Sequence, residues 1–101
     1  MKAITEDVAK VFGVTEAQIL GRQRWQPLAL ARQVAMVIVL ESLPFNTIQQ
    51  VAAYFRRDRT ALIHARTAIL NQVTYDSKLA RLIEILRKKH VKGLDELLEV
   101  A

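Results

Sequence analysis

Cysteine is absent from the 101-residue sequence, and glycine, proline and aromatic residues are scarce. Without cysteine, the chain cannot form a disulfide scaffold or a thiolate metal site. Three glycines and two prolines leave few breaks, and no alternation of apolar and polar residues suggests a strand. The longest apolar run, Val34 to Leu40, has seven residues, whereas a bilayer span needs about 20. These absences predict one helical globular domain.

The amino-terminal residues do not resemble a secretory signal, because Glu6 and Asp7 come before any apolar run. We therefore expect an intracellular, soluble protein that is not associated with a membrane. The domain is expected to span residues 1–101, with a core over about 3–90 and a carboxy-terminal extension over 91–101.

Positive charge is concentrated in one segment of the chain. Residues 22–66 hold seven bases and two acids, whereas eight bases and eight acids cancel elsewhere, so this segment accounts for the net charge of +5. All seven bases are arginine, whose planar group suits phosphate oxygens and guanine edges. The segment predicts a polyanionic partner, provided that these side chains converge on one surface: Arg22, Arg24, Arg32, Arg56, Arg57, Arg59 and Arg66.

The first half of the sequence predicts three helices. Residues at helical spacing form a first stripe that ends at Gly13. Thr15 is a suitable N-cap for a short helix that ends at Gly21. A central buried helix is expected from Pro27 to Ser42, after a basic connection in which Trp25 is expected to pack over helix ends. The inward residues of the first helix are predicted to be Ile4, Val8, Val11 and Phe12.

The second half predicts a short helix from Thr47 to about residue 55, a tight connection and a longer helix with Asp58 as its N-cap. This longer helix covers about 58–73, and another covers about 77–90 and ends in a basic run. The segment 94–100 is expected to add a last turn or two. Opposite the apolar arc of the longer helix, a small polar stripe is predicted at Thr60, His64, Thr67 and Asn71.

The helix pair 47–55 and 58–73 has the layout of a helix-turn-helix, whose second helix lies in the major groove of DNA. Small outward residues would let this helix approach the bases. Its amino terminus favours phosphate, and Arg56, Arg57 and Arg59 flank that end. The sequence therefore predicts binding to double-stranded DNA.

Three stretches resemble one family. They are the opening pattern Val8-Ala9 to Leu20 with Phe12-Gly13-Val14, the run Ala31-Arg32-Gln33-Val34-Ala35-Met36, and the run Arg57-Asp58-Arg59-Thr60-Ala61-Leu62-Ile63-His64-Ala65. They resemble the DNA-binding carboxy-terminal domain (domain IV) of the bacterial chromosomal replication initiator DnaA. The resemblance extends from Ile4 to about Lys89. It implies an all-α, Trp-repressor-like bundle of about six helices that binds short double-stranded sites at the replication origin without a cofactor. It also implies a cytoplasmic protein associated with the bacterial nucleoid.

The resemblance also implies roles for individual residues. Arg24 matches an arginine that enters the minor groove, and Arg32 and Gln33 match positions that hold phosphates. His64 matches a motif histidine and is placed with the phosphate contacts. The position of the charge adds Arg22, Arg56 and Arg57 to those contacts. The matched residues that read bases are Asp58, Arg59, Thr60 and Ala61.

Three departures from the family pattern predict a changed base preference. Arg59 and Ala61 stand where the family motif has histidine and a second threonine, and the turn over 55–58 is one residue shorter and lacks glycine. Arginine favours the O6 and N7 atoms of guanine, whereas alanine can only contact a thymine methyl. Each of the two residue changes, at Arg59 and Ala61, is expected to shift base preference by ~1–3 kcal/mol.

Several activities are not expected of this chain. With glycine only at positions 13, 21 and 93, no phosphate-binding loop of the form G-x-x-x-x-G-K-[ST] can be written, so ATPase activity is excluded. Carboxylates do not cluster and the two histidines are far apart, so we expect neither an enzyme nor a metal site, and no small-molecule substrate. The chain is either an excised domain or a free-standing relative.

Two alternative functions stay open. The helix-turn-helix could belong to a transcriptional regulator with another site specificity. Alternatively, the arginines could bind an acidic protein, in which case the chain would be a basic helical adaptor with an apolar patch beside the arginines. The cognate DNA sequence and the oligomeric state do not follow from the sequence.

Overall fold

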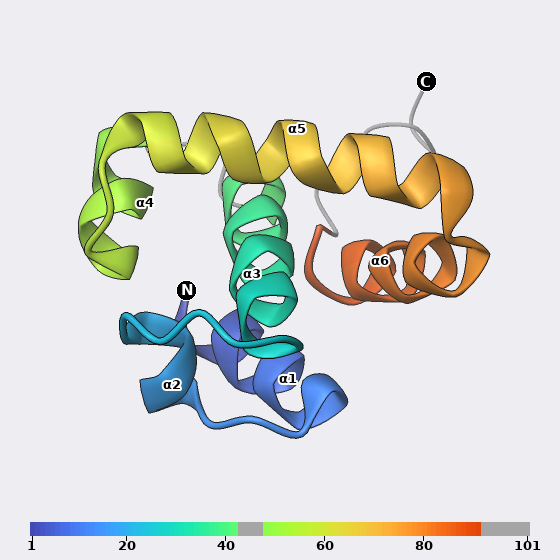
Figure 1. Cartoon of the computed structure of the whole chain (residues 1–101), viewed down its shortest axis with the longest axis horizontal. Coiled ribbons are helices and arrows are strands. Elements are labelled where there is room, and N and C mark those ends of the chain that lie inside the picture. Colours follow the sequence, from blue (N-terminus) through green and yellow to red (C-terminus); the bar gives the residue numbers. More distant parts are fainter. Residues whose placement is uncertain (43–47, 92–101) are drawn as a thin grey trace.

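A computed structural model describes residues 1–42 and 48–91, and these ranges contain six helices and no strand (Figure 1). The prediction of an all-α bundle of about six helices is confirmed. The expected helix start at Thr47 and the expected turn over 94–100 lie outside the described residues. None of the described helices is long and apolar enough to span a membrane. The helices are α1 Lys2–Phe12, α2 Glu16–Leu20, α3 Leu28–Ser42, α4 Ile48–Phe55, α5 Arg59–Tyr75 and α6 Ser77–His90.

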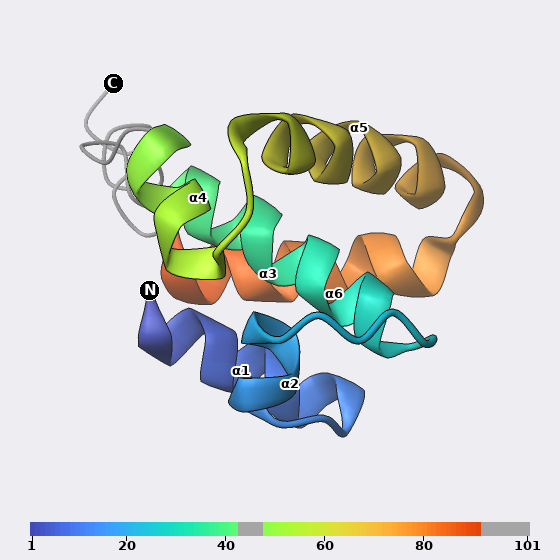
Figure 2. The ribbon, with the colours of Figure 1, turned by 60° about the vertical axis from the view of Figure 1, so that its left-hand side comes forward.

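Helix α3 is the centre of the bundle. It is apolar on most of its circumference, as expected for a helix enclosed by others, and each of the other five helices packs against it. Figure 2 shows α3 between α5 on one side and α1 with α2 on the other. Helix α5 lies across one end of α3, with α4 and α6 at the two ends of α5 (Figure 1).

Local signals set the helix boundaries where the sequence placed them. Gly13 has a left-handed φ of 69° and ends α1. Thr15 and Gln18 form a reciprocal capping box at the start of α2. The Asp58 Oδ1 accepts a hydrogen bond from the Ala61 amide at 2.9 Å and caps α5. Asp76 caps α6 in the same way, through the amide of Leu79.

The inner face of α1 differs from the predicted one. Val11 is 51% exposed, because the buried stripe runs through Ile4, Thr5, Val8 and Ala9 and leaves residue 11 at its edge. Thr5 is buried instead. Its hydroxyl donates to the carbonyl of Met1 at 3.0 Å and accepts from the Tyr54 hydroxyl at 3.1 Å, which satisfies the buried oxygen and ties α1 to α4.

The basic run that ends α6 is neutralised by acids. Arg87 forms a bidentate ion pair with Glu41 on α3, with distances of 2.6 and 2.8 Å. Lys88 pairs with Glu84 at 3.5 Å. Lys89 and His90 both contact the carboxylate of Asp7 on α1. Arg87, Lys89 and His90 hold the last turn of α6 against α3 and α1, whereas the Lys88–Glu84 pair lies within α6. The charge of this run therefore does not add to the arginine-rich segment.

Asp7 makes the stability of the fold depend on pH. Its Oδ2 lies 2.8 Å from Lys89 Nζ and 2.7 Å from His90 Nε2. The hydrogen bond from Lys89 lowers the pKa of Asp7 below its usual 3.8, against the raising effect of burial, and His90 lowers it further. A carboxylate with a lowered pKa in the folded state stabilises the fold above its unfolded pKa, and this stabilisation is lost as the pH falls through the folded pKa.

We therefore expect the free energy of unfolding to decrease as the pH falls below about 3.8. Asp7→Asn should remove up to ~1 kcal/mol of that decrease, a modest amount because the pair is partly solvated. Thermal unfolding of both proteins above and below this pH measures the difference. Identical pH dependence in the two proteins would show that Asp7 contributes nothing.

Candidate nucleic-acid interface

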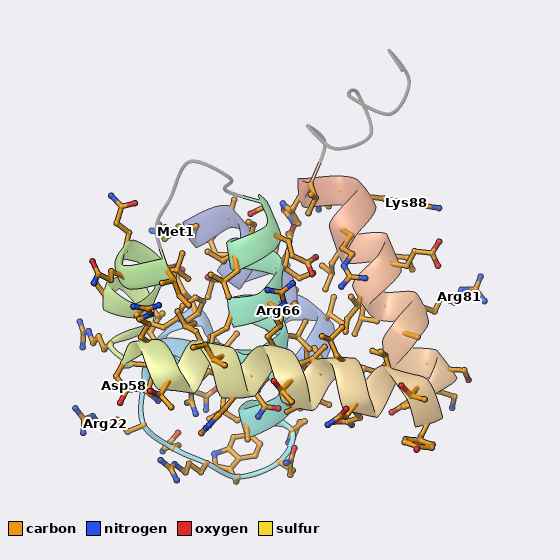
Figure 3. The ribbon with its side chains drawn as sticks, turned by 90° about the horizontal axis from the view of Figure 1, so that it is seen from above. Met1, Arg22, Asp58, Arg66, Arg81 and Lys88 are labelled. Atoms are coloured by element: carbon orange, nitrogen blue, oxygen red, sulfur yellow. The ribbon has the colours of Figure 1, made fainter. Side chains whose placement is uncertain are left out.

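Four arginines from two separate segments meet at the beginning of α5. Arg22 and Arg24 come from the connection between α2 and α3, whereas Arg56 and Arg57 come from the turn between α4 and α5. Together with two residues at the start of α5 they line a hollow of about 300 Å³. Figure 3 shows Arg22 and Asp58 at the same end of α5. The α5 residues in the hollow are Asp58, its N-cap, and Ala61.

The charges in this hollow repel one another. Burial lowers the pKa of Arg57, and the nearby cations Arg22 and Arg24 lower it further. Among the described residues, none of the four guanidinium groups forms an ion pair with a carboxylate. The carboxylate of Asp58, which accepts from the Ala61 amide, also lines the hollow and offsets one of the four positive charges. The hollow is therefore a concentration of positive charge that an anion would relieve.

The outer face of α5 is accessible along its length. Arg59 and Thr60 are exposed in the first turn, and His64 is exposed one turn later. Thr67 and Asn71 are exposed further along, so the predicted polar stripe is confirmed. The amino terminus of α5 also has the positive end of the helix dipole. Ala61 is partly buried between this face and the hollow.

Arg56 adopts a backbone conformation that usually requires glycine. Its φ is 56°, in the left-handed region, which costs roughly 1–2 kcal/mol for a residue with a Cβ atom. This conformation closes α4: the amide of Arg56 donates to Ala53 O at 3.1 Å, and that of Arg57 donates to Ala52 O at 3.0 Å. The shorter turn without glycine is thus built by placing an arginine where the backbone favours glycine.

Arg56→Gly is expected to raise the free energy of unfolding by about 0.5–1 kcal/mol, because relief of the strained φ exceeds the entropy that glycine adds to the unfolded chain. Urea-induced unfolding measures this gain. Arg57→Gly is the matched control and should destabilise the fold, because Arg57 lacks the positive φ and its Nη2 donates to Gly21 O at 2.6 Å. Destabilisation by both substitutions would contradict the assignment of strain to Arg56.

Arg32 does not lie where the predicted phosphate contact would need it. It is only 6% exposed. Its Nε donates to Ile19 O at 2.7 Å, its Nη1 to Gln23 O at 2.7 Å and its Nη2 to Gln18 O at 2.8 Å. Burial lowers its pKa, followed by repulsion from Arg57 and Arg24. The predicted phosphate contact by Arg32 is therefore not supported: its guanidinium group is occupied by backbone carbonyls of α2 and of the α2–α3 connection.

Gln33 and Arg66 lie outside the arginine-lined hollow. Gln33 is partly buried on α3, next to Arg32 in the chain. Arg66 is exposed, but it lines a second hollow with Ile63, Leu70 and residues of α3 and α4, on the opposite side of α5 from Arg22 (Figure 3). The seven arginines therefore do not all converge. Arg22, Arg24, Arg56 and Arg57 share one hollow, and Arg59 lies at the adjoining helix start. Arg32 is buried near Arg24 and Arg57 without lining the hollow, whereas Arg66 lines the other one.

Trp25 departs from its expected packing role, because it remains 47% exposed beside Arg24. The bonds from Arg32 and Arg57 to backbone carbonyls of the α2–α3 segment were not predicted. The available signal was the short helix itself, because the last carbonyls of a helix lack partners and attract donors. Among the described residues, no group of histidine, aspartate and glutamate is arranged to hold a metal ion.

The sequence matches the family described as bacterial dnaA protein helix-turn-helix over residues 1–69. A chromosomal replication initiator protein DnaA from Caldanaerobacter subterraneus subsp. tengcongensis is 36% identical over 93 residues, which is 92% of this chain and 20% of the relative. The DnaA of Thermoanaerobacter pseudethanolicus is 34% identical over the same shares of the two chains. That of Streptococcus pyogenes serotype M1 is 33% identical over 90 residues, or 88% of this chain and 20% of the relative.

The chain thus spans about a fifth of the length of these curated relatives. The matched residues include the whole of α1 to α4 and the first part of α5, with the arginine-lined hollow between them. From this match, the chain belongs to the family of bacterial DnaA helix-turn-helix domains.

Proposed function

We propose that this chain binds double-stranded DNA by placing the exposed face of α5 in the major groove. The observation that carries the proposal is the hollow of four arginines beside the capped start of that helix. Helix-turn-helix proteins bind with the amino-terminal residues of the second helix at the base edges, while nearby cations contact the backbone. The hollow and the exposed first turn of α5 supply both parts of that arrangement.

The placement of each residue suggests its role. Arg22, Arg56 and Arg57 would contact phosphates on the two sides of the hollow, whereas Arg24 would enter the adjacent minor groove. Gln33 and His64 are retained as phosphate contacts. The proposed base-reading group lies in the first turn of α5 and its cap, and it consists of Asp58, Arg59, Thr60 and Ala61.

The relatives are named chromosomal replication initiators, and we propose a related role for this chain in binding origin-type sites in the cytoplasm. In this chain Arg59 and Ala61 replace two residues of the family motif, so the preferred site should contain a guanine that Arg59 can contact. The proposed activity is binding alone, because the chain contains no phosphate loop that would support nucleotide hydrolysis.

Selection of bound duplexes from a random pool tests the proposal and identifies the site in the same experiment. The selected duplex should bind with an affinity that decreases with salt, with a slope of log K against log salt of about −0.9 for each phosphate contacted. Failure to enrich any duplex, or an affinity that salt does not change, would refute DNA binding.

A matched pair of variants distinguishes phosphate contacts made by the hollow from an effect of the net charge of the protein. Arg22→Ala should reduce the steepness of the salt slope by about 0.9. Arg81→Ala removes the same charge from α6, at the other end of α5 (Figure 3), and should leave the slope unchanged. Equal effects of the two substitutions would mean that the affinity reflects net charge and not the hollow.

The adaptor alternative receives less support from the structure. It requires an apolar patch beside the arginines, but the hollow with the half-exposed Ile63 and Leu70 has no lining residue in common with the arginine hollow. A regulator with another site specificity would use the same surface, and the sequence of the selected duplex distinguishes it from an origin-binding protein.

A further inference from the structure

Two buried or half-buried arginines hold the connection that contains Arg22 and Arg24. Arg32 of α3 donates three hydrogen bonds, of 2.7 to 2.8 Å, to the carbonyls of Gln18, Ile19 and Gln23. Arg57, from the turn before α5, donates to Gly21 O at 2.6 Å. The connection is therefore fixed at Gly21 and Gln23. These two residues flank Arg22, and Gln23 directly precedes Arg24.

The chemistry explains why arginine is needed at position 32. The last carbonyls of a short helix lack amide donors from a following turn. In α2 the carbonyl of Gln18 accepts from the C-cap amide of Gly21 at 3.2 Å and still has room for Arg32, and the carbonyl of Gln23 is within reach of the same guanidinium group. A guanidinium group has donors in several fixed directions of one plane, whereas a lysine ammonium is a compact point charge. Burying Arg32 is tolerated because Nε and both terminal nitrogens are each hydrogen-bonded.

We propose that Arg32 is a positioning residue that pre-organises the α2–α3 connection, so that Arg22 and Arg24 are ordered before the partner arrives. This inference rests on the proposed function, since it concerns how the chain binds DNA. The entropy of ordering a loop is lost at binding unless the free protein has already lost it. Arg32 makes no contact with DNA in this account and acts only through the connection.

Arg32→Lys separates positioning from a charge effect. It keeps the positive charge but cannot serve three carbonyls in divergent directions. We expect Arg32→Lys and Arg32→Ala to weaken binding of the selected duplex by a similar factor, roughly tenfold, with a salt slope equal to that of the unmodified protein. A direct phosphate contact predicts the opposite: recovery by lysine and a slope about 0.9 shallower in Arg32→Ala. That outcome would overturn the proposal.

A double-mutant cycle with Arg24→Ala tests the route of the effect. If Arg32 acts through the connection, Arg32→Lys should cost much less affinity in a chain that already lacks the Arg24 side chain. Additive losses would show that Arg32 acts independently of Arg24 and would overturn the proposal. Circular dichroism melting of each variant verifies that the binding comparison is made between folded proteins.

The order of the α2–α3 connection can also be measured in the unmodified protein, without any variant and without DNA. Backbone ¹⁵N order parameters of residues 22–26 in the free chain should be close to ~0.85, the value of rigid backbone. Values below ~0.6 would show a flexible connection and overturn the proposal. If the order parameters are high and no duplex is selected, then the anchoring exists but the proposed function fails, so the two failures are distinguishable.

Discussion

Replacing Phe55 by alanine is expected to lower the free energy of unfolding by about 3–5 kcal/mol. Phe55 is fully buried, ends α4 and forms an edge-to-face contact with Tyr54, with ring centroids 5.0 Å apart. Alanine would leave a cavity at the junction of the two helices of the helix-turn-helix. Small domains are stable by only about 5–15 kcal/mol, so this single change should remove a large part of the stability, as measured by urea-induced unfolding.

Tyr54→Phe is the matched control for this prediction. It keeps the aromatic ring beside Phe55 and removes only the hydroxyl that donates to Thr5 Oγ1 at 3.1 Å. The expected loss is about 1 kcal/mol, the usual net contribution of one hydrogen bond. If Phe55→Ala costs no more than Tyr54→Phe, the packing of the helix pair does not depend on the buried ring.

The helices and their ends could be predicted from the sequence because they depend on residues close together in the chain. The capping interactions of Thr15 and Asp58 each span three residues, and Gly13 ends α1 through its own backbone. The apolar residues on most of the circumference of α3 predicted its central place in the same way. The resemblance to the DnaA family covered the same helices, so the local sequence signals and the family pattern predicted the same fold.

The partners of charged residues could not be predicted, because they depend on how distant segments come together. Asp7 and His90 are 83 residues apart, and Glu41 and Arg87 are 46 apart. Arg32 shows the same difficulty at a proposed binding residue: its charge suggested a surface contact, but the carbonyls that it bonds become neighbours only when α2 packs on α3. Arg66 was predicted to join the other six arginines because it lies in the same segment of the sequence. Its position on α5 instead places it in the second hollow, on the opposite side of that helix from Arg22.

Arg59→Ala is expected to remove a preference for guanine at one position of the selected duplex, at a cost in discrimination of ~1–3 kcal/mol. Arg59 is the first residue of α5 and is exposed, and no ion pair links it to another described residue. Its neighbour Asp58 is occupied as the cap, so the guanidinium group is available to O6 and N7 of a guanine. Competition binding with each of the four bases at every position of the site measures the change.

Two further variants locate the effect at the base and not at the backbone. Arg22→Ala should weaken every duplex by about the same factor, because a phosphate contact carries no direct sequence information. Arg59→His introduces the histidine of the family motif and should shift the preference at the same single position without changing the salt slope. If Arg59→Ala instead weakens all duplexes equally and makes the slope shallower by about 0.9, then Arg59 holds a phosphate, and base recognition must come from other residues in the first turn of α5.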